Sequence, residues 1–344
     1  MQGSPSDVLE VKNLSVSTRR HGENLSILSG IDLKVKASEI VGVVGESGSG
    51  KSTLARAVTR LLPEVMIVNS GSILLRGQDI LRARASTVHR IRPGGVSMVF
   101  QSPLNALNPL LPIGHQVAEA FRYLEGVTRR QALDRSVEIL ERMGIRDASR
   151  RLAAYPHEFS GGQRQRIVIA IALAGKPAVL IADEPTSALD VTTQAAILEM
   201  FVEIARENAT AIIFVSHNYA VVSTLCSRVL VLYAGRLMEV GRADRLLTDP
   251  RHPYTAALID SLPSIDRRAN TLQVIPGSPP RLGEITQGCP FHPRCRHAQD
   301  RCLTASMELH EVGRDHASAC VRVSELWDGP SDATQSSTQI DDRN

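Results

Sequence analysis

The 344-residue sequence has few aromatic residues and no long apolar run. Phe, Trp and Tyr make up 3% of it, which argues against a surface that stacks single-stranded bases. Apolar stretches such as IVIAIALAG, from Ile167, are far shorter than the roughly 20 residues that a membrane-spanning helix needs. Five cysteines are too few for a disulfide scaffold, and a formal net charge of +3 does not indicate a nucleic-acid-binding surface. Since the first residues, MQGSPSDVLE, carry no secretion signal, we expect a cytosolic protein that does not itself cross a membrane.

Short β-branched runs alternate with helix-like stretches from Val8 to about Glu239. The runs include IVGVV, GSILL, AVLIA, AIIFV and RVLVLY. This alternation predicts an α/β fold with a mostly parallel sheet that is covered on both faces. Residues 105–160 lack such runs and have apolar positions three and four apart, so we expect a helical insert there.

The composition changes after Pro263. The following segment is rich in Pro and Gly, holds four of the five cysteines and has no helix or strand periodicity. The last residues are rich in Ser, Thr, Asp and Gln and are expected to be disordered. We therefore predict a core over residues 1–260, a small irregular extension over 261–325 and a disordered tail over 326–344.

A glycine-rich loop, GESGSGKST, follows the run IVGVV and precedes a helix-like stretch. It fits the phosphate-loop pattern G-x-x-x-x-G-K-[ST] in the required strand–loop–helix context. Its glycines let backbone N–H groups point at phosphate oxygens, and the helix adds its unpaired N-terminal N–H groups. Lys51 is expected on the β- and γ-phosphates, and the Ser52 hydroxyl on Mg²⁺. The predicted nucleoside triphosphate-binding residues are Gly45, Ser47, Gly48, Ser49, Gly50, Lys51, Ser52 and Thr53.

Two acidic residues, Asp183 and Glu184, end the apolar run AVLIA. They would stand at the C-terminal edge of a buried strand, where ligands bind in parallel sheets. We predict that Asp183 holds Mg²⁺ and that Glu184 orients and polarises the attacking water.

The segment FSGGQRQR, at 159–166, lies shortly before this acidic strand. Ser160, Gly161 and Gly162 precede a helix whose N-terminus would form a second anion site. The N-K-x-D tetrad of GTPases does not occur in the sequence. One phosphate loop and one spare phosphate-binding helix end are most simply explained by two chains that each cap the nucleotide of the other.

The order of these motifs resembles the ATP-binding subunit of ABC transporters over residues 8–260. The motifs are GESGSGKS, VFQSPLNALNP, FSGGQRQR, VLIADEPTSALD and VSHN, and in combination they are highly specific. The resemblance implies a P-loop ABC ATPase core with a helical subdomain, and ATP hydrolysis. It also implies that Glu184 is the catalytic base, that His217 contacts the γ-phosphate, that Gln101 contacts the metal and water, that Asp190 lies at a dimer interface, and that Ser160, Gly161, Gly162 and Gln163 contact the nucleotide of the opposite subunit.

One stretch departs from this family. Many members stack adenine on an aromatic side chain near the first strands, and here that stretch reads STRRHGENL. His21 is the candidate for stacking, with Arg19 or Arg20 as cation–π alternatives. A surface histidine without a role is an equal alternative.

The segments TDPRHPYTAALIDSLP and IPGSPPRLGEITQGCPFHPRC resemble the C-terminal extension of oligopeptide/dipeptide importer ATPases. The resemblance implies a peptide importer in which this chain pairs with a homologous second ATPase subunit. The pair would work on two membrane-spanning permease subunits, fed by an extracytoplasmic binding protein, at the cytoplasmic face of the inner membrane and without nucleic acid. The same role for nickel, opines or sugars, or a soluble non-transport ABC ATPase, are the alternatives.

Four cysteines of the extension are spaced C-x₅-C-x₆-C-x₁₇-C. Four thiolates suit either Zn²⁺ or an iron–sulfur cluster, and the spacing alone leaves both open. Some peptide-importer ATPases with this extension carry a [4Fe–4S] cluster, so the resemblance favours a cluster on Cys289, Cys295, Cys302 and Cys320. Zinc, with His292 or His297 replacing a cysteine, and unligated thiols remain alternatives.

Overall fold

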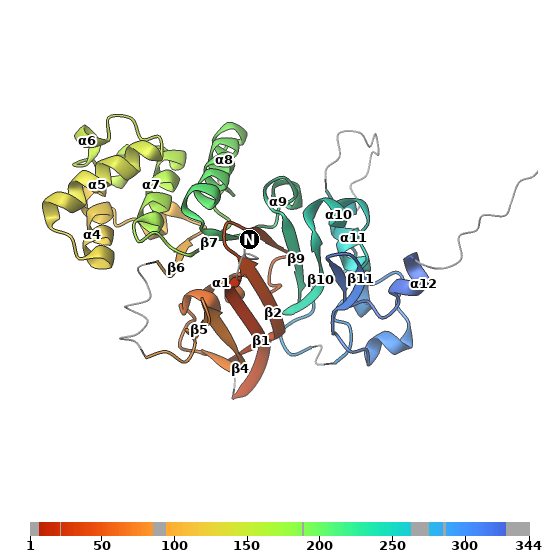
Figure 1. Ribbon diagram of the computed structural model, residues 1–344. Helices are drawn as coiled ribbons and strands as arrows, with labels where there is room; N and C mark the ends of the chain where they lie inside the picture. The colour runs from red at the N-terminus through yellow and green to blue at the C-terminus, as the bar shows by residue number, and fades with distance from the viewer. Residues whose placement is uncertain are drawn as a thin grey trace, which may run out of the picture.

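The computed structural model describes residues 7–20, 22–84, 94–187, 189–262, 275–284 and 287–327. It contains an eight-stranded sheet, a four-stranded sheet, and helices that lie mostly on one side of the larger sheet (Figure 1). The strand order of the larger sheet is β11-β12-β10-β9-β3-β8-β7-β6.

Five neighbouring strands of the larger sheet run parallel to one another. Except for the edge strand β6, in which only Val99 is buried, these strands are buried on both faces and consist mainly of Val, Ile, Leu and Ala, which is typical of parallel strands. In sheet order they are β9 (Arg228–Tyr233), β3 (Ile40–Val44), β8 (Ala211–Val215), β7 (Val179–Asp183) and β6 (Val96–Val99).

The other three strands of this sheet are antiparallel. They are β10 (Arg236–Arg242), which pairs with β9, then β12 (His316–Ser318) and β11 (His310–Gly313). The segment after Pro263 was expected to be irregular, yet β12 and β11 extend the core sheet. Strands of four and three residues are too short to leave a readable alternation in a sequence.

The four-stranded sheet is antiparallel and was absent from the sequence prediction, which placed the run GSILL in the parallel sheet. Its order is β2 (Glu23–Lys36), β1 (Asp7–Arg20), β4 (Met66–Leu75) and β5 (Gln78–Asp79). The GSILL run forms part of β4, which pairs antiparallel with β1. The buried face of this sheet packs against α1 (Lys51–Thr59) and one face of β3 in a single core.

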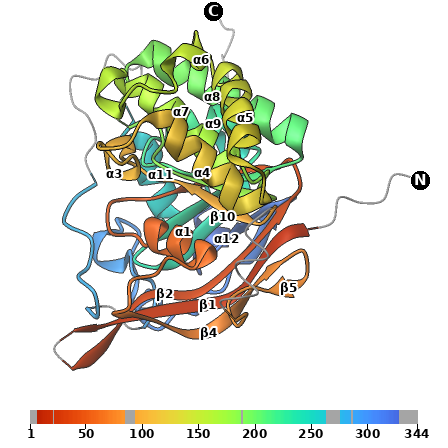
Figure 2. The same ribbon diagram turned by 90° about the vertical axis from the view of Figure 1, so that its left-hand side faces the viewer.

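Between β6 and β7 the chain is helical. The helices are α3 (Pro103–Ala106), α4 (Ile113–Glu125), α5 (Arg129–Arg142), α6 (Ala148–Arg151), η1 (Pro156–Glu158) and α7 (Gly161–Leu173). With α8 (Val191–Asn208) they lie on the side of the molecule away from the four-stranded sheet (Figure 2).

The remaining helices connect the strands or belong to the extension. They are α8 (Val191–Asn208), α9 (Tyr219–Leu225), α10 (Ala243–Thr248), α11 (Pro253–Asp260), η2 (His292–Arg294), η3 (Asp300–Leu303) and α12 (Val323–Trp327). Within the described ranges, no helix is both long and apolar enough to cross a membrane.

Candidate active site

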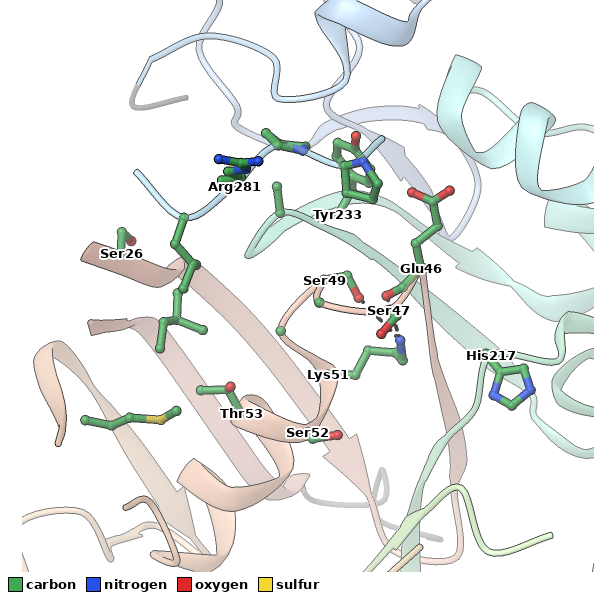
Figure 3. A pocket seen from close by; sticks show the side chains of 18 of the residues that line it. Ser26, Glu46, Ser47, Ser49, Lys51, Ser52, Thr53, His217, Tyr233 and Arg281 are labelled. Atoms are coloured by element: carbon green, nitrogen blue, oxygen red, sulfur yellow. Dashed lines mark hydrogen bonds between the residues drawn. The ribbon is translucent and has the colours of Figure 1, made fainter. Parts of the chain in front are cut away.

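A cavity of about 730 Å³ opens at the C-terminal ends of the parallel strands. The loop after β3 forms its floor, Gln101 follows β6, Glu184 follows β7, and His217 follows β8. Because parallel strands end at one edge, four segments far apart in the sequence meet there. Figure 3 shows Lys51 and Ser52 on the floor, with His217 to one side.

The phosphate loop depends on glycine at two positions. Gly45 has φ +151°, and a Cβ atom there would lie 2.1 Å from the carbonyl oxygen of Leu232. Gly50 is the N-cap of α1 with φ +103°, and its Cβ would lie 2.6 Å from Leu28 Cδ2. Only glycine fits both positions, and the loop therefore opens its backbone N–H groups toward the cavity.

Lys51 is buried at the start of α1, and its ammonium group is held by the loop itself. Nζ donates to the carbonyl oxygens of Gly45 (2.7 Å) and Glu46 (2.9 Å). Burial lowers the pKa of Lys51, while the nearby carboxylates of Glu184 and Asp183 act in the opposite direction. The loop thus presents a cation, at the edge of the cavity, that can turn to a phosphate group.

Asp183 ends β7 opposite the start of α1. The Ser52 hydroxyl donates to Asp183 Oδ1 at 3.3 Å. Burial raises the pKa of Asp183, and the negative charge of Glu184 raises it further. A buried carboxylate beside a hydroxyl, with a second carboxylate next to it, is a donor set that suits Mg²⁺.

Glu184 adopts the left-handed backbone conformation, with φ +47°, which is uncommon for a residue other than glycine. Its N–H donates to Val215 O (2.9 Å), which fixes the turn against β8. Gln101 Nε2 donates to Glu184 Oε2 at 2.7 Å, and His217 Nδ1 lies 3.1 Å from Oε1. The strained turn thus holds the Glu184 carboxylate in the cavity between two polar partners.

The SGGQ segment lies elsewhere on the chain. Ser160 is the N-cap of α7: its Oγ accepts from Gln163 N (3.3 Å), and Ser160 N donates to Gln163 Oε1 (3.1 Å). Neither these two residues nor the glycines between them line the cavity described above. The helix end is therefore formed, but it is separate from the phosphate loop of its own chain.

The start of α8 lies next to the SGGQ segment. Asp190 is the N-cap of α8, since its Oδ1 accepts from Thr193 N at 3.0 Å. A Cβ atom on Gly162 would lie 2.5 Å from Thr193 Cγ2, so the two helix starts pack closely only because Gly162 is glycine. The structure thus places Asp190 beside the SGGQ segment rather than in the cavity.

Sequence reasoning missed one wall of the cavity. Pro279–Gly283, from the extension, lines it together with Tyr233 and Ile27. Figure 3 shows Arg281 and Tyr233 on the side of the cavity opposite Ser52. No local motif marks this segment, and only the packing of the extension brings it to the site. His21, the candidate for adenine stacking, lies outside the described residues.

The sequence has close relatives among curated proteins. It is 42% identical, over 93% of this chain and 98% of the relative, to a protein of Brucella melitensis named as a peptide import ATP-binding protein. Residues 28–187 match the ABC transporter family, and residues 238–302 match the family described as oligopeptide/dipeptide transporter, C-terminal region. The chain belongs to the ABC transporter family. Another relative is the oligopeptide transport ATP-binding protein OppD of Mycobacterium tuberculosis, 44% identical over 95% of this chain and 54% of that longer protein.

Solved structures of ABC ATPases share the fold. One is a dimeric post-hydrolysis state of the ATP-binding cassette MJ0796 bound to ADP and Pi. Its sequence is 26% identical to this chain, and the match covers 68% of this chain and 98% of MJ0796 with a TM-score of 0.61. CbiO1 of Clostridium perfringens, part of the ABC transporter complex cbiONQ, is 28% identical and covers 71% of this chain and 91% of that one, also with a TM-score of 0.61. These findings confirm the predicted P-loop ABC ATPase core, and with it an ATP-hydrolysing chain.

The four cysteines of this ABC ATPase face one small pocket. They line a cavity of about 20 Å³ together with His292 and His297. Burial raises the pKa of Cys289 to about 12 and that of Cys320 to about 11, so both thiols are protonated at neutral pH. No disulfide joins them, and nowhere in the described part of the chain do three or more His, Cys, Asp or Glu side chains stand in a metal-holding arrangement. The donor set suits a thiolate-bound metal group, but the predicted metal site stays a prediction.

Proposed function

We propose that this chain hydrolyses ATP to power the import of oligopeptides or dipeptides. The observation that carries the proposal is the pairing of two features in one chain. Lys51, Asp183 and Glu184 converge on the cavity at the end of the parallel strands. The chain continues into a region that matches the oligopeptide/dipeptide transporter family, and its relatives are named for peptide import.

The residues of the cavity divide the chemistry between them. Lys51 and the loop N–H groups bind the phosphates, and Ser52, Asp183 and Gln101 are the residues that would hold Mg²⁺, which neutralises phosphate charge when bound. Glu184 accepts the proton of the attacking water, and His217 contacts the γ-phosphate. Because Gln101 and His217 already contact both carboxylate oxygens, the base is oriented before the substrate arrives. The proposed nucleotide-binding set is Gly45, Ser47, Gly48, Ser49, Gly50, Lys51, Ser52, Thr53 and His21.

Two ATPase subunits would complete each other's sites. Ser160, Gly161, Gly162 and Gln163 form a helix start that lies outside the cavity of their own chain, next to Asp190. A head-to-tail partner would place this helix start on the nucleotide held by the other phosphate loop, with Asp190 between the subunits. The dimeric state of the related MJ0796 cassette supports this arrangement. The proposed partner is a homologous second ATPase subunit.

The dimer would drive two membrane-spanning permease subunits, supplied by an extracytoplasmic substrate-binding protein. This chain would then be a peripheral protein on the cytoplasmic face of the inner membrane. Its proposed parts are the ATPase domain at 1–260, with a helical subdomain at about 105–160, the extension at 261–325 and the tail at 326–344.

Purification from detergent-solubilised membranes, followed by reconstitution, tests the proposal. We expect two permease subunits and a second ATPase to copurify, and ATP-dependent uptake of labelled di- or oligopeptides in the presence of the binding protein. The E184Q variant should assemble in the same way and transport nothing. A purely cytosolic partner would favour a soluble ABC ATPase, and a binding protein specific for nickel, opines or sugars would replace the peptide cargo.

We also propose that the four-cysteine pocket carries a [4Fe–4S] cluster, with Zn²⁺ as the alternative occupant. All four thiols face one cavity, which supports a single shared group. Such a group supplies cross-links in a segment that has little apolar core of its own.

Metal analysis and absorption spectra of anaerobically purified protein decide between the two. A cluster gives a brown protein with broad visible absorption, and replacing any of the four cysteines by Ser should bleach it. Replacing Cys226, which is buried in the core away from the pocket, by Ser is the control and should keep the colour. A colourless protein with stoichiometric zinc would reverse the assignment.

A further inference from the structure

Glu46, the second residue of the phosphate loop, is bound at all three of its polar groups. Its carbonyl oxygen accepts from Lys51 Nζ at 2.9 Å, within the loop. Its N–H donates to the Tyr254 hydroxyl at 2.9 Å. Its carboxylate accepts two bonds from Arg294, at 2.6 Å from Nη1 and 3.1 Å from Nη2. Two of the three partners therefore come from beyond the strands that form the site, from α11 and η2.

Arg294 is held as firmly as Glu46. Only 5% of its side chain is exposed. Besides Glu46, it donates to the Tyr233 hydroxyl (3.0 Å) and to the carbonyl oxygens of Pro276 (2.8 Å) and Ile275 (3.4 Å). The Glu46 side chain is 22% exposed, so the pair is largely shielded from water. Breaking a two-pronged arginine–carboxylate pair in such a place is costly because it leaves a charge without a partner. The pair thus fixes η2 and the phosphate loop to each other.

Tyr254 strengthens the same link. It is the Tyr of the HPYT segment, is buried, and has its ring 4.5 Å from the Tyr233 ring and 5.2 Å from the Phe291 ring. Phe291 is the N-cap of η2 and Arg294 is its last residue, so the aromatic cluster and the ion pair hold this turn at its two ends. The loop and the extension therefore have a common buried interface.

The turn that carries Arg294 lies between two of the four cysteines. Cys289 precedes it, its N–H donating to Cys302 O at 2.9 Å, and Cys295 follows Arg294 directly, its N–H donating to His292 O at 3.2 Å. Both thiols line the small pocket described above. The turn that positions Arg294 is thus flanked on both sides by residues whose thiols line this pocket.

We propose that Arg294 is a positioning residue that couples the four-cysteine pocket to ATP binding. This coupling rests on the proposed function, in which the cavity is the ATP site, and it would regulate that site. When the thiols hold their group, Arg294 keeps Glu46 and the loop in the binding conformation. When they do not, Arg294 is displaced and the loop loses affinity. Linkage makes the effect reciprocal, so that bound ATP stabilises the occupant of the cysteine pocket by the same factor.

The role of Arg294 in ATP binding is tested by the nucleotide affinity of variants. We expect R294M to weaken MgATP binding by about 10–100-fold, with kcat at saturating ATP changed far less, because Arg294 does not touch Glu184, Gln101 or His217. R294K, which keeps the charge but not the two-pronged geometry, should be intermediate. R242M is the matched control, because Arg242 forms a similar two-pronged pair with Asp244 that is exposed and away from the loop.

A double-mutant cycle with E46Q separates positioning from general damage. If Arg294 acts through Glu46, E46Q/R294M should bind ATP no more weakly than R294M alone. Effects that simply add, or an R294M protein that binds ATP like the unaltered protein, would overturn the inference. Failure of the unaltered protein to bind ATP would instead contradict the proposed function. E46Q keeps the test open should R294M fail to fold.

The coupling between the cysteine pocket and ATP binding needs a readout other than turnover. C320S removes a thiol far from Arg294 in the sequence and should weaken ATP binding in the unaltered background but not further in R294M. In the protein as purified, MgATP should slow the loss of iron or zinc to a chelator, and R294M should abolish that protection. Equal effects of C320S in both backgrounds, or metal loss that ignores MgATP, would disprove the coupling.

Discussion

His217 and Glu184, from the ends of neighbouring strands, meet in the cavity with His217 Nδ1 at 3.1 Å from Glu184 Oε1. Gln101 Nε2 holds the other carboxylate oxygen at 2.7 Å. With 18% of its side chain exposed, Glu184 is oriented by two partners but still open to the cavity. This arrangement is what a base needs in order to receive a proton from water in one fixed direction.

The E184Q variant should therefore bind MgATP normally and hydrolyse it about 10²–10⁴-fold more slowly. The amide keeps the size of the side chain and can still accept from Gln101, but it cannot accept a proton. Phosphate release and the binding of a fluorescent nucleotide measure the two effects separately. E199Q, on the exposed side of α8, is the control. Near-normal turnover in E184Q would remove Glu184 from its proposed role.

Asp183 predicts a conflict between stability and function. Burial and the charge of Glu184 raise the pKa of Asp183, so an ionised Asp183 lowers the free energy of unfolding at neutral pH. D183N keeps the acceptor for Ser52 and should raise the melting temperature of the nucleotide-free protein. It should also raise the Mg²⁺ concentration needed for hydrolysis by about 10–100-fold.

The stability gain of D183N should depend on pH. An unfolded aspartate ionises at about pH 4, so the gain should be present at neutral pH and disappear as the pH falls through the raised folded-state pKa of Asp183. Thermal unfolding of both proteins across this range measures it, with D134N, at an exposed position on α5, as the control. A D183N protein less stable than the unaltered one at neutral pH would contradict the assigned cause.

The sequence predicted those parts of the molecule that local patterns encode. Strands β3, β8 and β9 coincide with apolar runs because strands buried on both faces need apolar residues at every position. The long strands β1 and β2 were missed since one face is exposed and their alternating pattern is broken by several shifts in register. The phosphate loop was found because its chemistry fixes both residue types and spacing.

Contacts between distant segments could not be predicted in this way. Arg294 lies 248 residues from Glu46, and no spacing rule relates them. The wall formed by Pro279–Gly283 likewise follows from where the extension packs, which is set by the aromatic cluster around Tyr254 and by β12 on the sheet edge. Tertiary packing decides such contacts, and a single sequence carries no local trace of it.

His252 should make stability depend on pH. It is buried, and its Nδ1 accepts from Tyr254 N at 3.0 Å, which caps α11. Burial lowers the pKa of His252 to about 3, well below the usual value of about 6.5. Between these two pKa values His252 is protonated in the unfolded chain but neutral in the folded one. The free energy of unfolding should therefore fall as the pH drops from about 6.5 toward about 3.

The H252N variant tests this directly. Asparagine is a good N-cap but does not titrate, so H252N should lose this part of the acid sensitivity, on the order of 1 kcal/mol per pH unit. Urea unfolding at several pH values gives the comparison, and H310N, at an exposed position on β11, should keep the original slope. The same slope in H252N as in the unaltered protein would show that other groups cause it.

Ser160 offers a way to separate a helix cap from a contact with the opposite nucleotide. Aspartate caps helices as well as serine does, so S160D should change the free energy of unfolding by less than about 0.5 kcal/mol. Its negative charge, however, would face the phosphates of ATP in the proposed dimer. We therefore expect ATP-dependent dimerisation to be lost and hydrolysis to fall by about 10²-fold or more.

The S160A variant provides the complementary result. It removes the side-chain acceptor for Gln163 N and should lower the free energy of unfolding by about 1 kcal/mol. Unlike S160D, it places no negative charge beside the phosphates. Light scattering of the E184Q background with ATP measures dimerisation, and phosphate release in the assembled complex measures turnover. If S160D dimerises and hydrolyses like the unaltered protein, Ser160 does no more than cap α7, and the proposed head-to-tail sites are wrong.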